Sequence, residues 1–463
     1  MFTRFFYTTA FLFPLAWLLL LPDPASAIDK VKLRGYITAR DGTDKVLILD
    51  DVVRLGPGIQ LEWNGLDEKG VTVPSELEIG MLVEAEGVWA GKHDFRADKV
   101  SVDLSVSDKV IREKAYIMHI PADAEKVGQG AAAQLKIDGE SLRISPQSRR
   151  SWSAPPLPAS VPGSKSAAPE ERLLGYRVEY EGLRQPDGTI AVQSLELSVP
   201  APPDAYEIPH SIRIARGRDP KTSTDIVEFR KGDKIQGRIK LFPVPEVQDY
   251  VRDLAFSLLP AGVGGARVGL EFRFFVIEDS GINAAAFSDG TVLVNTGLLG
   301  ATQNEAQLAF VLSHEIAHVL QAHQWRHTTE TRTKRVLITM AAIAGSYFVG
   351  NLSNFLGAIG LEALVNGYSR RLEDQADRIA LQNMIELGYD PREGPAFSRT
   401  MIDRYSMRST SKIFSSHNSP VLRGSFLTVQ IQKQYPKVEF PSAKVDTLAF
   451  RTMKEAMGPV KVQ

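Results

Sequence analysis

The chain has 463 residues, of which 24% are charged and 43% hydrophobic, a composition typical of a globular protein with about two to four domains. Its 54 Lys and Arg residues are balanced by 55 Asp and Glu residues, which argues against a nucleic-acid partner because phosphate binding needs a basic excess. The absence of Cys excludes disulfides, thiolate metal ligands and Cys nucleophiles, so any metal site must use His and carboxylates.

Residues 1–27 have the pattern of a secretory signal peptide. Arg4 precedes a short apolar stretch from Ala10 to Leu21, and a small-x-small cleavage site ends at Ala27. Because the apolar run is shorter than the ~20 residues that a membrane-spanning helix needs, cleavage is favoured over a retained anchor. We therefore expect a periplasmic or otherwise secreted protein.

Residues 28–200 contain an internal repeat of short alternating strands. Residues 79–102 align without gaps to residues 174–197, and Gly87 coincides with Gly182. In both copies the apolar positions stay in phase around a polar turn, which predicts strand, turn and strand.

The repeat predicts two related all-β modules, residues 28–110 and 111–200, that resemble partly open oligomer-binding barrels. Residues 145–171 are rich in Pro, Ser and Ala, and we expect them to form a flexible loop in the second module. A scaffold or docking role is favoured for both modules, with an envelope protein as the expected partner.

The next informative segment, residues 304–323, has apolar side chains at helical spacing. It contains His314 and His318, which share one helix face and can bind one cation, while Glu315 can reach a water molecule beside it. Two His and one carboxylate typically bind Zn²⁺, here one ion per chain. Glu315 would then pass a proton from water to the leaving amine. The alternative is a surface helix with two hydrogen-bonded His.

A third ligand is expected in residues 368–381, which also have helical spacing. Glu373 and Asp377 are four positions apart and share a face. We expect Glu373 to complete the zinc site and Asp377 to orient a ligating His from behind. The alternative is a solvated acidic face, which would bind nothing.

These motifs resemble the gluzincin metallopeptidases of the HtpX and CAAX-prenyl-protease superfamily, most closely its secreted BepA-like and LoiP-like bacterial members. The similarity covers roughly residues 240–425. It is carried by the segments Asn283–Leu299, Glu305–His318, Ser369–Asp377, Gly388–Pro391 and Ser416–Arg423.

The resemblance implies that His314, His318 and Glu373 hold zinc and that Glu315 is the general base, with Asp377 beside them. It implies that His417 lies over the metal, where it either steadies the oxyanion or fills the open coordination position. It also implies a substrate-binding group, which we expect to consist of Ala284, Ala285, Ala286 and Arg423. The three alanines would form an edge strand that pairs with an extended peptide.

After the two all-β modules, we therefore expect residues 205–463 to form an α+β, mostly helical, zincin-type metallopeptidase domain. Residues 336–361 carry no charge and are long enough to span a bilayer. Buried helices are favoured over a membrane-inserted segment, with peripheral contact at the membrane surface as a further expectation.

The leading hypothesis is an exported zinc endopeptidase that hydrolyses misfolded or misassembled cell-envelope proteins. One alternative is an envelope binding or chaperone module whose metal site is latent or structural, since the β-modules occupy so much of the chain. A weaker alternative is an integral-membrane protease built around residues 336–361.

Overall fold

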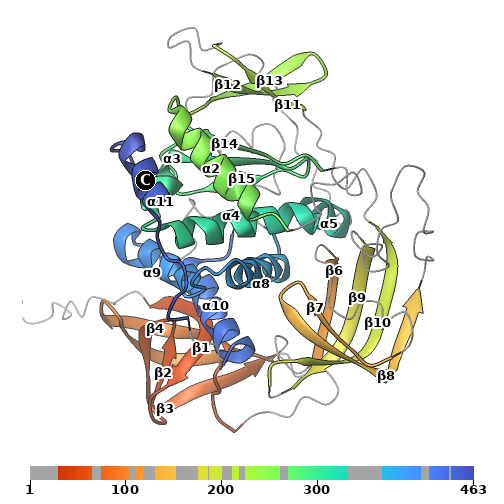
Figure 1. Cartoon of the computed structure of the whole chain (residues 1–463). Coiled ribbons are helices and arrows are strands. Elements are labelled where there is room, and N and C mark those ends of the chain that lie inside the picture. Colours follow the sequence, from red (N-terminus) through yellow and green to blue (C-terminus); the bar gives the residue numbers. More distant parts are fainter. Residues whose placement is uncertain are drawn as a thin grey trace, which may run out of the picture.

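A computed structural model gives the arrangement of the chain (Figure 1). The signal segment 1–27 and the apolar stretch 336–361 lie outside the residues that it describes. Those residues are 30–64, 75–104, 110–117, 131–152, 176–185, 187–200, 211–217, 225–260, 270–331, 368–407, 417–436 and 440–462.

The first β-module is a closed five-stranded barrel with the strand order β1-β2-β3-β5-β4. Alternate side chains fill its interior, including the fully buried Ile37, Phe95 and Val102. The strands are β1 (Val31–Arg40), β2 (Lys45–Ile48), β3 (Asp51–Asn64), β4 (Leu82–Gly91) and β5 (Asp94–Asp103).

The second β-module repeats this topology strand for strand. Its order is β6-β9-β10-β8-β7, and β8 runs parallel to β10 just as β3 runs parallel to β5. The predicted repeat is confirmed as the hairpins β4–β5 and β9–β10. Among the described residues the second sheet is open between β6 and β7. Its strands are β6 (Val110–Tyr116), β7 (Ala133–Ile137), β8 (Glu140–Trp152), β9 (Tyr176–Arg184) and β10 (Ile190–Pro200).

The matched glycines of the repeat have a packing reason. The strand register shifts at Gly87 and again beside Gly182, so each hairpin has a bulge at the same place. A Cβ on Gly87 would lie 2.0 Å from the Arg96 carbonyl oxygen, and one on Gly182 would lie 2.6 Å from that of Ala191. Only glycine permits this approach of the partner strand.

The prediction of a loop over residues 145–171 is wrong for its first part. Residues 145–152 belong to β8, and the remainder lies outside the described residues. Arg149 and the residues after it pair with β10, and the Ser148 hydroxyl donates to the Val192 carbonyl at 2.6 Å. Pairing with β10 therefore outweighs the loop-like composition.

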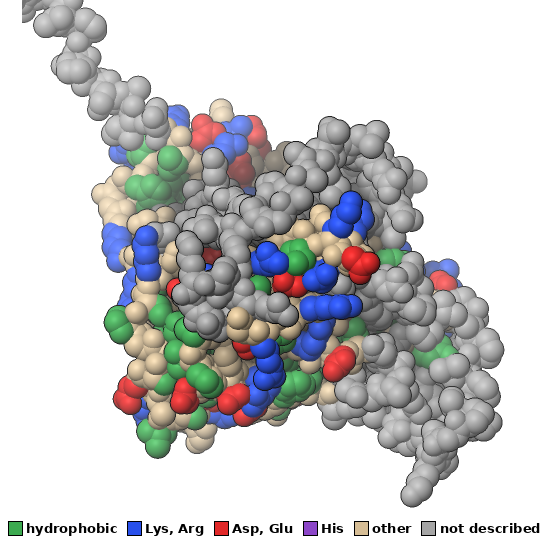
Figure 2. Space-filling model, turned by 90° about the horizontal axis from the view of Figure 1, so that it is seen from above, with side chains coloured by type: hydrophobic (Ala, Val, Ile, Leu, Met, Phe, Trp, Pro, Cys, Tyr) green, Lys and Arg blue, Asp and Glu red, His purple; other side chains and the backbone are tan. Residues whose placement is uncertain are grey.

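The second half of the chain begins with an antiparallel sheet that the sequence analysis did not anticipate. It contains β11 (Ser211–Ala215), β12 (Ile226–Lys231) and β13 (Lys234–Lys240). Seen from this end of the molecule, basic side chains gather on the surface (Figure 2), and the three strands supply six Lys and Arg against Glu228 alone. The opposite face packs Val227 and Phe229 against a second small sheet.

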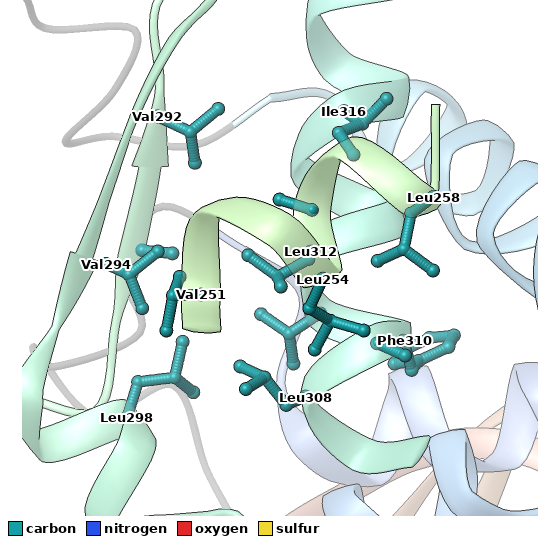
Figure 3. Close-up of a cluster of buried hydrophobic side chains, with 14 of the residues drawn as sticks. Val251, Leu254, Leu258, Val292, Val294, Leu298, Leu308, Phe310, Leu312 and Ile316 are labelled. Carbon is teal, nitrogen blue, oxygen red and sulfur yellow. The ribbon is translucent and has the colours of Figure 1, made fainter. Parts of the chain in front are cut away.

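That second sheet has the order β14-β16-β15 and lies above the longest helices (Figure 1). Its strands are β14 (Arg273–Ile277), β15 (Ala284–Ala286) and β16 (Thr291–Asn295). Side chains of α2, such as Val251 and Leu254, meet Val294 of β16 and Leu312 of α4 in one apolar core (Figure 3).

Helices make up most of the remainder, which confirms the predicted α+β, mostly helical domain after two all-β modules. None of the described helices combines the length and apolarity needed to cross a bilayer. The helices are α2 (Pro245–Ser257), α3 (Thr296–Ala301), α4 (Glu305–Leu320), α5 (His323–Thr331), α8 (Arg370–Glu386), α9 (Glu393–Tyr405), α10 (Pro420–Gln434) and α11 (Leu448–Met457).

Candidate metal centre

Helix α4 carries His314, Glu315 and His318, and every one of its residues is buried. The side chain of Asn304 caps its first turn by accepting from the Gln307 backbone N–H. Glu305 in that turn accepts hydrogen bonds from the hydroxyls of Tyr250, Tyr389 and Thr447. The helix is therefore fixed in position and does not lie on the surface, which removes the alternative of a surface helix.

Helix α8 brings Glu373 against the two imidazoles. Glu373 Oε1 lies 3.4 Å from His318 Nε2, and Oε2 lies 3.6 Å from His314 Nε2. The two Nε2 atoms are 2.9 Å apart. Because the Glu373 side chain is only 1% exposed, the alternative of a solvated acidic face does not hold.

Asp377 stands behind His314, as its spacing from Glu373 predicts. Its Oδ1 atom lies 2.8 Å from His314 Nδ1, on the side of the ring away from Glu373. Arg423 Nε donates to the same oxygen at 2.8 Å, and its guanidinium lies over the ring of Phe310. Arg423 is 8% exposed, so the side chain expected at the substrate site is buried against Asp377 instead.

His417 completes the cluster from the loop before α10. Its Nδ1 atom lies 2.9 Å from Glu373 Oε2 and 3.4 Å from His314 Nε2. Its Nε2 atom lies 3.6 Å from Glu315 Oε1. Ligand atoms of His314, His318, Glu373 and His417 all lie within 4.8 Å of one another, as a set that can hold one metal ion.

The electrostatics of the cluster favour a cation. Burial lowers the pKa of His318 well below its usual value, so its ring is neutral and offers a lone pair. Burial opposes ionisation of Glu373, but the neighbouring imidazoles of His417 and His318 outweigh it and hold the Glu373 pKa well below its ordinary value. Burial and Arg423 lower the pKa of His314, whereas Asp377 and Glu373 raise it and prevail. The carboxylates therefore attract positive charge to this point.

The donor set fits zinc. Atoms bound at about 2.0–2.2 Å to one tetrahedral ion lie roughly 3.3–3.6 Å apart. The distances of 3.4 and 3.6 Å from Glu373 to the two imidazoles match this range, whereas the 2.9 Å between the two Nε2 atoms is shorter. Glu373 Oε1 is buried without a hydrogen-bond partner among the described residues, as expected of an atom reserved for an ion.

Comparison with known proteins agrees with this geometry, since residues 245–429 match peptidase family M48. These residues form an M48 peptidase domain. The M48 match confirms the resemblance to metallopeptidases, which are a metal-dependent family.

The relatives extend the similarity across bacteria and mitochondria. The chain is 30% identical over 239 residues to the beta-barrel assembly-enhancing protease of Escherichia coli K12, covering 48% of each chain. It is 31% identical over 167 residues to the protein of that name from Yersinia pestis, covering 35% of this chain and 34% of the relative. It is 31% identical over 128 residues to mitochondrial metalloendopeptidase OMA1 of Arabidopsis thaliana, covering 27% and 25%. The chain thus spans half or less of the length of these relatives.

The predicted substrate strand of the M48 domain is β15. It pairs antiparallel with β16 and is an edge strand of the three-stranded sheet. Ala284, Ala285 and Ala286 are only 4–5% exposed, so this edge is closed to solvent in the structure.

The M48 domain also places two residues at the centre to which the sequence analysis gave no role. The ring of Tyr368 stacks on that of His318 with centroids 4.3 Å apart. His323 Nδ1 lies 2.8 Å from His318 Nδ1. The signal for His323 was available, since it follows His318 by five residues, but periodicity alone does not show which ring nitrogen it meets.

Proposed function

We propose that the chain is an exported zinc-dependent endopeptidase of the bacterial cell envelope. The observation that carries this proposal is the buried convergence of His314, His318 and Glu373, with Glu315 beside them, inside the M48 match. One zinc ion per chain, cleavage after Ala27 and a periplasmic location belong to the same proposal.

In this proposal, each side chain has a separate task. His314, His318 and Glu373 would hold the zinc ion, which when bound would polarise the scissile carbonyl and make a water molecule more acidic. Glu315 removes the proton from the attacking water and delivers it to the leaving amine. Asp377 accepts from His314 Nδ1–H, which leaves Nε2 free to bind. Arg423 holds Asp377 in place and acts as a positioning residue.

We propose further that the resting enzyme is latent. A ring nitrogen of His417 lies within 4.8 Å of the ligand atoms of His314, His318 and Glu373, so His417 would fill the fourth position that a catalytic zinc site keeps open. The closed edge of β15 supports the same state, because an extended substrate needs that edge to pair. Activation then requires His417 to move away, and Ala284, Ala285 and Ala286 to become accessible.

The proposed substrates are misfolded or misassembled envelope proteins. Support comes from the bacterial relatives, whose names describe proteases that enhance assembly of beta-barrel proteins. An envelope protein partner for the β-modules, and membrane-surface contact through residues 336–361, remain predictions of the sequence.

The central test is Glu315→Gln. The variant should bind one zinc ion with unchanged affinity and lose at least about a thousandfold of casein-cleaving activity, because the general base is gone. Glu246→Gln, at an exposed position on α2, is the matched control and should keep full activity. Equal activity of the two variants contradicts the role of Glu315. A chain that binds zinc tightly but stays inactive even as His417→Ala would favour the envelope-binding alternative.

His417→Ala separates latency from oxyanion stabilisation. If His417 fills the fourth position, its removal should raise the cleavage rate several-fold while zinc stays bound. A fall in rate at unchanged zinc content would instead assign His417 to the oxyanion. Zinc stoichiometry measured on the same preparation is the control for loss of metal.

A further inference from the structure

A buried hydrogen-bonded network of side chains leads away from the metal centre behind His318. His318 Nδ1 contacts His323 Nδ1 at 2.8 Å, and His323 Nε2 contacts Gln375 Oε1 at 3.0 Å. Arg326 donates to the same Gln375 oxygen at 2.7 Å. His318, His323 and Gln375 are each 2% exposed or less.

This hydrogen-bonded network ends in the second β-module. The Gln375 amide nitrogen donates to Asp138 Oδ2 at 2.7 Å and to the Lys114 carbonyl at 3.0 Å. Lys114 lies on β6, and Asp138 lies in the turn between β7 and β8. Both acceptors therefore come from the β-module, more than 200 residues away from Gln375 in the chain.

The turn that supplies Asp138 is shaped to meet α8. Asp138 and Gly139 both have positive φ, 47° and 82°, which is the Asp-Gly pattern of a tight hairpin. A Cβ on Gly139 would lie 2.6 Å from the Arg378 carbonyl oxygen. Tyr180 donates its hydroxyl hydrogen to Asp138 Oδ1 at 3.0 Å, so the carboxylate is held from the module side as well.

The donor and acceptor of each hydrogen bond in this network are fixed in one order. Two acceptors on the module force the Gln375 amide nitrogen toward them and its oxygen toward His323. His323 must then carry its hydrogen on Nε2 and present a lone pair at Nδ1. That lone pair accepts from Nδ1–H of His318, which leaves His318 Nε2 unprotonated on the side of the other ligands.

We propose that the second β-module sets the tautomer and ring orientation of His318 through Gln375 and His323. The module therefore contributes directly to the metal centre. His314 differs, because its orienting carboxylate, Asp377, belongs to the protease domain itself. The inference rests on the proposed function, in which His318 binds zinc through Nε2.

The test compares two glutamines of α8 that both contact the second module. Gln375→Met removes the link to His323, whereas Gln382→Met removes only the hydrogen bond from the Gly139 N–H and a bond to Glu386. Both variants are made in the full chain labelled with ¹⁵N-histidine. Long-range ¹⁵N–¹H spectra of the metal-free protein report each ring tautomer, and chelator competition reports the zinc dissociation constant.

We expect wild type and Gln382→Met to show a single Nδ1–H tautomer for His318 and zinc affinities within twofold of each other. Gln375→Met should show mixed tautomers and about tenfold weaker zinc binding. Asp138→Asn, which keeps an acceptor oxygen toward Gln375, should behave as wild type. If Gln375→Met does not fold, Asp138→Ala breaks the same link from the module side and should give the same loss.

Unchanged tautomers and zinc affinity in the variants that break the link would overturn the inference. A wild-type chain that fails to bind zinc would instead overturn the proposed function, so the two failures are distinguishable.

Discussion

The two β-modules share one topology but contact the protease domain by different chemistry. The first module packs β1 on α10 through apolar side chains, such as Tyr36 against Phe426 with ring centroids 5.5 Å apart. The second module meets α8 through buried ions, where Arg378 lies 3.3–3.5 Å from carboxylates of Glu113, Asp138 and Glu140.

The difference shows how one repeated fold can take two roles. Apolar contacts are non-directional, so the packing of Tyr36 on Phe426 constrains the first module less tightly than buried ion pairs would. Directional contacts are added there by Arg399 with Asp51 and by the Tyr36 N–H with the Ser425 hydroxyl. Buried ion pairs are directional and costly to break, so the second module holds α8 in one position. That helix supplies Glu373, and its position therefore matters directly to the metal centre.

The largest expected effect comes from Arg378→Met. Removing the guanidinium leaves buried Glu113 and Asp138 without their cation, while Glu140 keeps Arg184. The loss should lower the local unfolding free energy of the β6–β10 sheet by about 3–5 kcal/mol. Hydrogen exchange measured on both sheets of the same molecule gives the local unfolding free energy of each. Arg399→Met is the first-module counterpart, because Arg399 pairs with buried Asp51 and exposed Asp50, and it should cost only about 1 kcal/mol. Equal losses in the two modules would remove the distinction.

An intermediate effect is expected where the modules are alike. Gly87→Ala and Gly182→Ala should each destabilise their own sheet by about 1–3 kcal/mol, because both force a Cβ into a partner strand. Gly91→Ala is a suitable control, since its Cβ would meet nothing closer than 3.7 Å. If hydrogen exchange shows a loss of stability in one module only, the bulges at Gly87 and Gly182 are not equivalent.

The smallest effect is a pH dependence of the second module. Burial disfavours ionised Glu140, but Arg184 and Arg378 outweigh it and hold the Glu140 pKa below its usual value. The stabilisation is therefore complete above the unfolded pKa of about 4.3 and is lost as pH falls through the lower folded pKa. Exchange protection of β6–β10 should drop with acid before that of β1–β5. Glu140→Gln should flatten the drop, and an unaltered profile would exclude Glu140 as its source.

Local patterns were enough to predict much of this protein. The alternation and the repeat predicted two all-β modules, and helical spacing predicted that His314 and His318 share a face, as do Glu373 and Asp377. These predictions succeeded because periodicity depends on neighbours within a few residues. The strand at residues 145–152 was missed because its pairing with β10 is formed by residues over forty positions away.

The sequence by itself determined which His and carboxylate side chains are candidate ligands, their spacing on each helix and the resemblance to a metallopeptidase family. Only the tertiary structure decided that Arg423 faces Asp377, that His417 lies among the ligand atoms, and that Gln375 joins the second β-module to His318. The physical reason is that a hydrogen bond depends on the direction and distance of two groups in space. Residues brought together from opposite ends of a chain acquire that geometry only when the whole domain packs.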